Sequence, residues 1–138
     1  MNVQVISLKD AVRYSYRSHD SESAVVSIRT PWACYEGNNI YPSNANKIKS
    51  VLRVCFDDVE SGTNCMDADH AKAIKQFIQN HLNRNIIVQC DAGVSRSAGV
   101  AAALMKYYND DDTPIFDNPK YRPNMLCYRT MLNALMGE

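Results

Sequence analysis

The sequence predicts an α/β fold in which a central, mostly parallel sheet of about four to five strands is flanked by helices. The main observation is an alternation along the chain. Short runs of β-branched and apolar residues alternate with segments whose apolar residues recur at helical spacing, as in consecutive βαβ units. The chain has 138 residues and neither a repeat nor a low-complexity linker, so 1–138 is expected to form a single domain.

The first half of the chain is predicted to hold three strands and one short helix. The runs at Val3–Ser7, Ser23–Ile28 and Val51–Phe56 are rich in β-branched residues, which favours strands. Ser7 is a suitable cap for a helix after the first strand, because its hydroxyl accepts from the free N–H groups of a first turn. Residues 29–47 are rich in proline, glycine and asparagine and are predicted to be loop.

The second half is predicted to hold one strand and three helices. Apolar residues at helical spacing predict a helix over 67–82, and Asn85–Gln89 is predicted to be a buried strand. Residues 97–108 are apolar nearly all round, which is typical of a buried helix. The polar, proline-containing stretch 109–124 is predicted to be loop, and a last helix is expected over 124–136.

Composition and charge exclude several classes of function. Hydrophobic residues make up 46% of the chain and charged residues 22%, and the formal net charge is zero. This balance argues against nucleic acid as a partner and against an acidic membrane surface. No apolar run approaches the roughly 20 residues of a membrane-spanning helix, and the first residues lack the pattern of a signal peptide. We expect a cytoplasmic monomer with neither a nucleic acid nor a membrane as partner.

Neither a disulfide framework nor a metal site is expected. There are five cysteines, an odd number without a CxxC pair, which favours a reducing compartment. Four of them are expected to be ordinary thiols: Cys34, Cys55, Cys65 and Cys127. The acidic stretch before His70 is interpreted as a helix start capped by Asp67 rather than as a metal site. No cofactor is expected.

The remaining cysteine, Cys90, lies in a turn between a predicted strand and a predicted helix. The first N–H groups of a helix lack partners and the helix dipole is positive there, so such a turn is a ready anion site. These groups and Arg96 would stabilise a thiolate at Cys90, and Gly93 lets the backbone curl around a ligand. The guanidinium of Arg96 matches two oxygens of a phosphate. A nucleophilic thiolate inside a loop that can bind phosphate predicts phosphoryl transfer.

The stretch CDAGVSRS at 90–97 resembles the CxxGxxR[ST] phosphate-binding loop of the cysteine-dependent protein tyrosine phosphatases. Two further segments resemble the dual-specificity branch. Asp58 follows a strand well upstream of the cysteine, and the pair Pro123 and Asn124 opens the last helix. The resemblance covers 24–135 and is to the small, minimal dual-specificity-like phosphatases of bacteria and their viruses. It implies the CX5R phosphatase fold.

The resemblance also implies a role for each site residue. Cys90 attacks phosphorus and forms a cysteinyl-phosphate, Asp58 protonates the leaving oxygen and later activates water, and Ser97 helps Cys90 to leave. The phosphate is held by Arg96 and the loop residues Asp91, Ala92, Gly93, Val94 and Ser95. The supporting residues are Gln89, Asn124 and Asp57. The implied substrate is a phosphoprotein, with phosphotyrosine accepted and phosphoserine or phosphothreonine also possible.

Some residue roles stay open. Asp57 is the other candidate for the general acid, and Ser97 is also a candidate helix cap. Arg29 and Trp32 either line the substrate entrance or belong to a plain loop with a buried aromatic ring.

The function also has alternatives. The family's histidine before the cysteine is replaced here by Gln89, which leaves a catalytically weak, phosphate-binding pseudophosphatase as one alternative. Val94 and Ser95 stand where many phospholipid-directed and RNA 5′-phosphate-directed relatives carry lysine and asparagine, so these substrates are less favoured. Rhodanese-like and arsenate-reducing enzymes also use a cysteine loop. Rhodanese-type loops do not require the upstream acid or the Pro-Asn pair, and the arsenate-reducing type carries its loop near the N-terminus.

Overall fold

The structure is a computed structural model that describes residues 1–16, 23–32 and 50–137. Its strands are β1 (Val3–Ile6), β2 (Ser23–Arg29), β3 (Ser50–Cys55) and β4 (Asn85–Gln89). Its helices of four residues or more are α1 (Leu8–Tyr16), α3 (Ala68–Gln79), α4 (Arg96–Asn109), α5 (Thr113–Phe116) and α6 (Met125–Leu135). The predicted α/β class is therefore confirmed.

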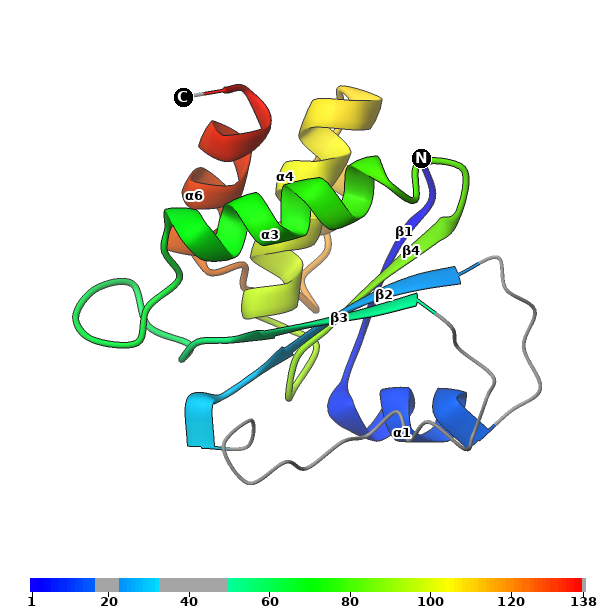
Figure 1. Ribbon diagram of the computed structural model, residues 1–138, viewed down its shortest axis with the longest axis horizontal. Coiled ribbons are helices and arrows are strands. Elements are labelled where there is room, and N and C mark those ends of the chain that lie inside the picture. Colours follow the sequence, from blue (N-terminus) through cyan, green and yellow to red (C-terminus); the bar gives the residue numbers. More distant parts are fainter. Residues whose placement is uncertain (17–22, 33–49, 138) are drawn as a thin grey trace.

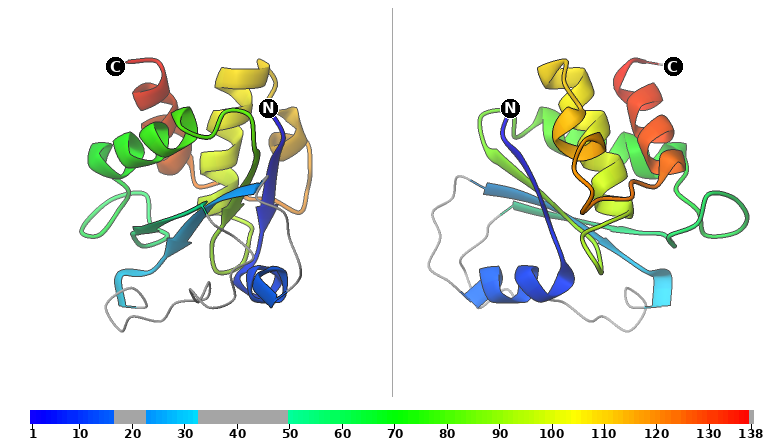
Figure 2. Two further views of the ribbon diagram at one scale, coloured as in Figure 1. Left: turned by 45° about the vertical axis from the view of Figure 1, so that its right-hand side comes forward. Right: turned by 180° about the vertical axis from the view of Figure 1, so that it is seen from behind.

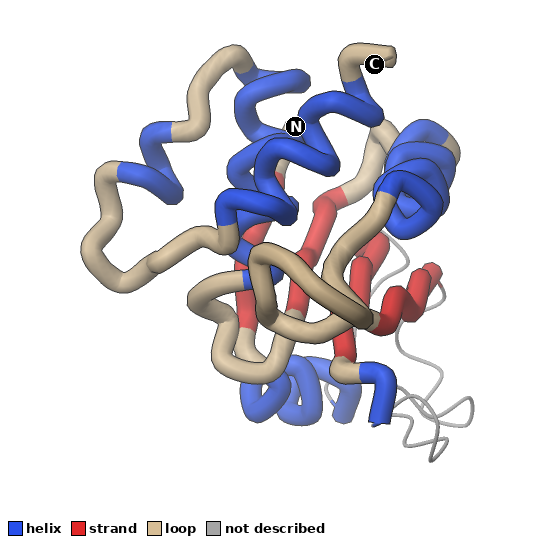
Figure 3. The backbone as a smooth tube through the Cα atoms, turned by 90° about the vertical axis from the view of Figure 1, so that its left-hand side faces the viewer, coloured by secondary structure: helices blue, strands red, loops and turns tan. Residues whose placement is uncertain are grey.

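The strands form a four-stranded sheet in the order β1-β4-β2-β3, and every pair in it is parallel. Val3 lies opposite Ile86 between β1 and β4, and Arg29 lies opposite Cys55 between β2 and β3. Parallel pairing brings the carboxyl ends of all the strands to one edge. Figure 3 shows the loops that follow the strands gathered on one side of the sheet. The residues after β3 and β4 therefore meet there, although they are far apart in the sequence.

Helices cover both faces of the sheet (Figures 1 and 2). Helices α3, α4 and α6 lie on one face and α1 lies on the other. The larger core lies under the three helices, where α4 is buried along most of its length, as its apolar sequence predicts. A Cβ atom on Gly99 would lie 2.5 Å from the Asn124 carbonyl oxygen and 2.9 Å from Cys127 Cβ. The close approach of α4 and α6 thus requires glycine at this position.

The opposite face is covered by α1 through a smaller apolar cluster. Ala11 packs there against Val25 of β2 and Ile87 of β4. Ser7 accepts a hydrogen bond from the Asp10 amide at 3.1 Å, so its predicted role as the cap of this helix is confirmed. The junction of β1 and α1 consequently lies beside the loop that follows β4, where the Leu8 amide donates to the Asp91 carbonyl at 3.0 Å.

The start of α3 also follows the prediction. Asp67 is its N-cap and accepts from the His70 amide at 3.0 Å, while His70 Nδ1 accepts from the Asp67 amide at 3.0 Å. This reciprocal capping box accounts for both side chains without a metal. The helix ends at Gln79, so 80–82, which the sequence predicts as the last turn of this helix, form turns instead.

Three expectations need correction. The stretch 109–124 is not all loop, because α5 forms within it: Pro114 stands in the first turn of that helix, where its missing N–H costs nothing, and Ile115 is buried. Arg29, expected in a loop, is the last residue of β2. Cys55 is disulfide-bonded and is therefore not the free thiol that was expected. Most of the predicted loop 29–47, including Cys34, lies outside the described residues.

No helix within the described ranges is long and apolar enough to cross a membrane.

Candidate active site

The turn after β4 has the geometry of an anion-binding loop. Residues 90–95 connect the buried end of β4 to the N-terminus of α4, so the free N–H groups of that helix face the turn. Gly93 has φ +69, and a Cβ atom there would lie 2.7 Å from the Ser7 amide nitrogen. Glycine is therefore required at this position for two reasons. The backbone is left-handed there, and the β1–α1 junction approaches too closely to leave room for a Cβ atom.

Cys90 is the first residue of this loop and is only 2% exposed. Its Sγ lies 3.0 Å from the hydroxyl of Ser97, which is fully buried in the first turn of α4. The N-cap position of α4 is occupied by Ser95 and not by Ser97, so the alternative role of Ser97 as the helix cap is not found. The Ser95 hydroxyl itself makes no capping bond.

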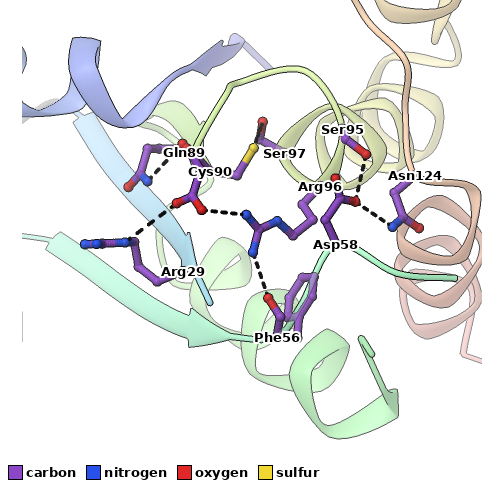
Figure 4. A network of polar contacts seen from close by, with 10 residues as sticks. Arg29, Phe56, Asp58, Gln89, Cys90, Ser95, Arg96, Ser97 and Asn124 are labelled. Atoms are coloured by element: carbon purple, nitrogen blue, oxygen red, sulfur yellow. Dashed lines mark hydrogen bonds and ion pairs between the residues drawn. The ribbon is translucent and has the colours of Figure 1, made fainter. Parts of the chain in front are cut away.

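Arg96 lies across the loop and is 4% exposed. Its Nη1 donates to the Phe56 carbonyl at 2.8 Å, and its Nη2 forms an ion pair with Asp91 Oδ2 at 3.1 Å (Figure 4). The buried Nε of Arg96 has no hydrogen-bond partner among the described residues. An unsatisfied buried donor on a charged group is costly, and an oxyanion bound in the loop could accept from it.

Asp91 also joins Arg96 to Arg29, one of the two residues considered above for the substrate entrance. Arg29, at the end of β2, forms an ion pair with Asp91 Oδ1 at 3.9 Å (Figure 4). Arg29 is buried, whereas Trp32 is 68% exposed, so the alternative of a plain loop with a buried aromatic ring is not found. The pairing of Arg29 with Asp91 was not predicted, because it depends on β2 lying beside β4, and that strand order is not evident from the sequence.

The carboxylate of Asp58 is held by two residues at the rim of the loop. Its Oδ1 accepts from the Ser95 hydroxyl at 2.8 Å and from Asn124 Nδ2 at 2.9 Å (Figure 4). Oδ2 of Asp58 has no hydrogen bond within the described part of the chain. The neighbouring Asp57 is bonded through its backbone amide to the Asn64 carbonyl at 2.7 Å. Of the two aspartates it is thus Asp58 whose side chain is tied to the phosphate loop.

Asn124 connects three parts of the site. Its Oδ1 caps α6 by accepting from the Cys127 amide at 3.1 Å, and its Nδ2 donates to Asp58 and to the Val59 carbonyl. Its backbone amide donates to the Ser95 carbonyl at 3.0 Å. The last helix, the loop that carries Asp58 and the phosphate loop therefore hold one another in place.

Two further features lie close to these residues. An open cavity of about 490 Å³ adjoins Asp58 and Ser95; it is lined by Asp58, Val59, Glu60, Ser61, Ser95, Arg122, Pro123 and Asn124.

Burial, and then the negative charge of Asp58, raise the pKa of the Cys127 thiol to about 12. Cys127 therefore stays a protonated thiol at neutral pH. The described residues hold no group of His, Cys, Asp and Glu arranged to bind a metal.

Comparison with known proteins finds likeness in structure only. No family model matches the sequence, and no curated protein matches it. Several solved phosphatase structures match at a TM-score of 0.64 and 16% identity. They include the Cydia pomonella PTP-2 phosphatase (96% of this chain, 85% of that chain), PTPMT1 in complex with PI(5)P (99% and 91%) and human DUSP28 (98% and 94%). The chain thus has the fold of the protein tyrosine and dual-specificity phosphatases, which confirms the expected fold.

Proposed function

We propose that this chain is a phosphatase that hydrolyses phosphate monoesters on proteins, phosphotyrosine among them, through a cysteinyl-phosphate intermediate. One observation carries the proposal. Buried Cys90, the N-terminus of α4 and a buried guanidinium with an unused donor at Arg96 Nε converge on a single turn. A phosphoryl group in this turn would satisfy that donor and the free N–H groups of the helix. The fold shared with known phosphatases supports the same conclusion.

The reaction proceeds in two displacements. First the Cys90 thiolate attacks phosphorus; the S–P bond forms, the bond to the leaving oxygen breaks, and Asp58 gives that oxygen a proton. Water then attacks phosphorus, Asp58 takes its proton, and the S–P bond breaks to release phosphate and the thiolate. Ser97, with its hydroxyl 3.0 Å from Cys90 Sγ, can donate a hydrogen bond to the departing sulfur. Because Ser95 and Asn124 hold Oδ1 of Asp58, its Oδ2 is available to carry the proton.

The test is hydrolysis of p-nitrophenyl phosphate and of a phosphotyrosine peptide across pH, by wild type and by Cys90→Ser, Asp58→Ala and Asp57→Ala. We expect Cys90→Ser to abolish turnover. Asp58→Ala should slow hydrolysis of the phosphotyrosine peptide by roughly 10²-fold or more, as expected for loss of a general acid, and that of p-nitrophenyl phosphate by less, because p-nitrophenoxide leaves readily without a proton. Asp57→Ala is the matched control and should retain most activity. A wild type that binds orthovanadate but turns over neither substrate would be a phosphate-binding pseudophosphatase. An Asp57→Ala variant slower than Asp58→Ala would reverse the assignment of the acid.

A phospholipid is a second candidate substrate, because one structure with this fold is that of PTPMT1 in complex with PI(5)P. The charge of the loop argues against it in this chain. Asp91 adds a half-exposed carboxylate beside Arg96, which would repel a headgroup that carries further phosphates. Phosphate release from PI(5)P, measured beside release from the phosphotyrosine peptide, decides between the two substrates.

A further inference from the structure

A buried polar pair lies directly behind the phosphate loop. Ser27 of β2 and Gln89 of β4 are opposite each other in the parallel register and are 1% and 0% exposed. The Ser27 hydroxyl donates to Gln89 Oε1 at 2.5 Å, and Gln89 Nε2 donates to the Cys90 carbonyl at 3.2 Å. Two residues earlier on these strands, Val25 and Ile87 belong to the apolar cluster under α1. Polar groups in such surroundings are stable only when they are hydrogen-bonded.

The two hydrogen bonds together determine which way the amide of Gln89 faces. If the amide were turned over, its oxygen would face the Cys90 carbonyl, and two acceptors would oppose each other. The hydroxyl of Ser27 stabilises the observed orientation, because it donates to the oxygen end of the amide. The Cys90 carbonyl can only accept and so selects the N–H₂ end of the amide, while the hydrogen bond from Ser27 to the other end holds the amide in place.

The accepting carbonyl belongs to the first peptide group of the loop. In a trans peptide the C=O of Cys90 and the N–H of Asp91 share one plane and point in opposite directions. A donor that holds the carbonyl back toward the sheet thus helps to direct the Asp91 N–H away from the sheet. In anion-binding loops, N–H groups so directed bind the ligand.

We infer that Ser27 is a positioning residue of the phosphate loop, which acts by orienting Gln89 and, through it, the Cys90–Asp91 peptide. The inference rests on the proposed phosphatase function and deepens it. Neither a serine hydroxyl nor a glutamine amide titrates between pH 5 and 9, in contrast to an imidazole. The support given to the loop is therefore the same across the pH range in which the enzyme would work.

The experiment compares Ser27→Ala with the matched control Ser23→Ala. Ser23 lies on the same face of β2 and is also buried, but it stands at the far end of the strand, opposite Asn85. For Ser27→Ala we expect kcat/KM for p-nitrophenyl phosphate to fall about tenfold and inhibition by orthovanadate to weaken by a similar factor. Ser23→Ala should leave both quantities unchanged, and Ser27→Thr, which keeps the hydroxyl, should restore them in part.

The route through Gln89 is tested by a double-mutant cycle with Gln89→Met. If Ser27 acts only by orienting Gln89, Ser27→Ala adds no further loss in the Gln89→Met background. Additive losses, or a Ser27→Ala variant that matches Ser23→Ala, overturn the inference. If Ser27→Ala does not fold, as shown by circular dichroism, Ser27→Cys replaces it, because cysteine has a similar size and donates only weakly. A wild type that neither hydrolyses the ester nor binds vanadate removes the proposed function itself, and this inference with it.

Discussion

Asn124 offers a sharp test of how the site is held together, because the two ends of one side chain have different partners. Its oxygen caps α6 through the Cys127 amide, and its amide nitrogen donates to Asp58 and to the Val59 carbonyl. Replacing Asn124 by serine keeps an N-cap oxygen but is too short to reach Asp58. Replacing it by alanine removes all three hydrogen bonds. The pair of variants therefore separates the capping of the helix from the anchoring of Asp58.

The expected magnitudes follow from these contacts. Loss of a helix cap costs about 1 kcal/mol of unfolding free energy. Loss of the two part-buried hydrogen bonds from Nδ2, to Asp58 and to the Val59 carbonyl, costs about 1 kcal/mol each. Asn124→Ser should therefore lose about 2 kcal/mol and Asn124→Ala about 3 kcal/mol. For a chain of this length that corresponds to a fall in Tm of roughly 10 °C for Asn124→Ala, with a smaller fall for Asn124→Ser.

Activity supplies the second measurement. A displaced Asp58 should slow the hydrolysis of phenyl phosphate about tenfold, because phenoxide is a poor leaving group without a proton. Hydrolysis of p-nitrophenyl phosphate should fall much less, because p-nitrophenoxide leaves readily. Both variants should show this difference between the two esters. Equal slowing of the two esters, or equal Tm values for the serine and alanine variants, would refute the assignment of separate roles to the two ends of the Asn124 side chain.

Three further predictions concern stability and reactivity. The hydrogen bond from the His70 amide lowers the pKa of Asp67 from 3.8. A carboxyl with a lowered folded pKa contributes stability that is present above its unfolded pKa and is lost as the pH falls through the folded pKa. Asp67→Ala should thus lower the free energy of unfolding, measured in urea, by about 1 kcal/mol at pH 7 and by progressively less below pH 3.8. A difference between the variant and wild type that does not change with pH would contradict this. Gly93→Ala should lose at least about 1 to 2 kcal/mol, because alanine does not suit the left-handed backbone, and vanadate binding should weaken with it; unchanged Tm and vanadate affinity would show that the loop tolerates a Cβ atom. Cys127, with a pKa of about 12, should react with iodoacetamide at pH 8 only after unfolding, as mass spectrometry of the alkylated peptides can show; rapid labelling of the native protein would contradict its burial.

The local features of this protein follow from the sequence by itself. The turn from β4 into α4 carries its cysteine, glycine and arginine within a few residues, so the anion site could be predicted from spacing alone. The cap at Asp67 and the cap at Ser7 depend on residues three positions apart, and both were predicted correctly. Such features need only the backbone geometry of a single turn, which nearby residues determine.

Only the tertiary structure decided which distant side chains meet. Asp58 and Asn124 are 66 residues apart and Ser27 and Gln89 are 62 apart, and each pair is joined by strand order or helix packing. In the observed register β2 lies beside β4 with Ser27 opposite Gln89, which puts Ser27 behind the loop. If the register of β2 shifted by one residue, the side chain of Ser27 would lie on the other face of the sheet. Strand order and register are set by the burial of the whole apolar core rather than by any short segment. The chemistry of the loop and the supporting residues Gln89 and Asn124 could thus be predicted from the sequence, whereas the place of Ser27 behind the loop could not.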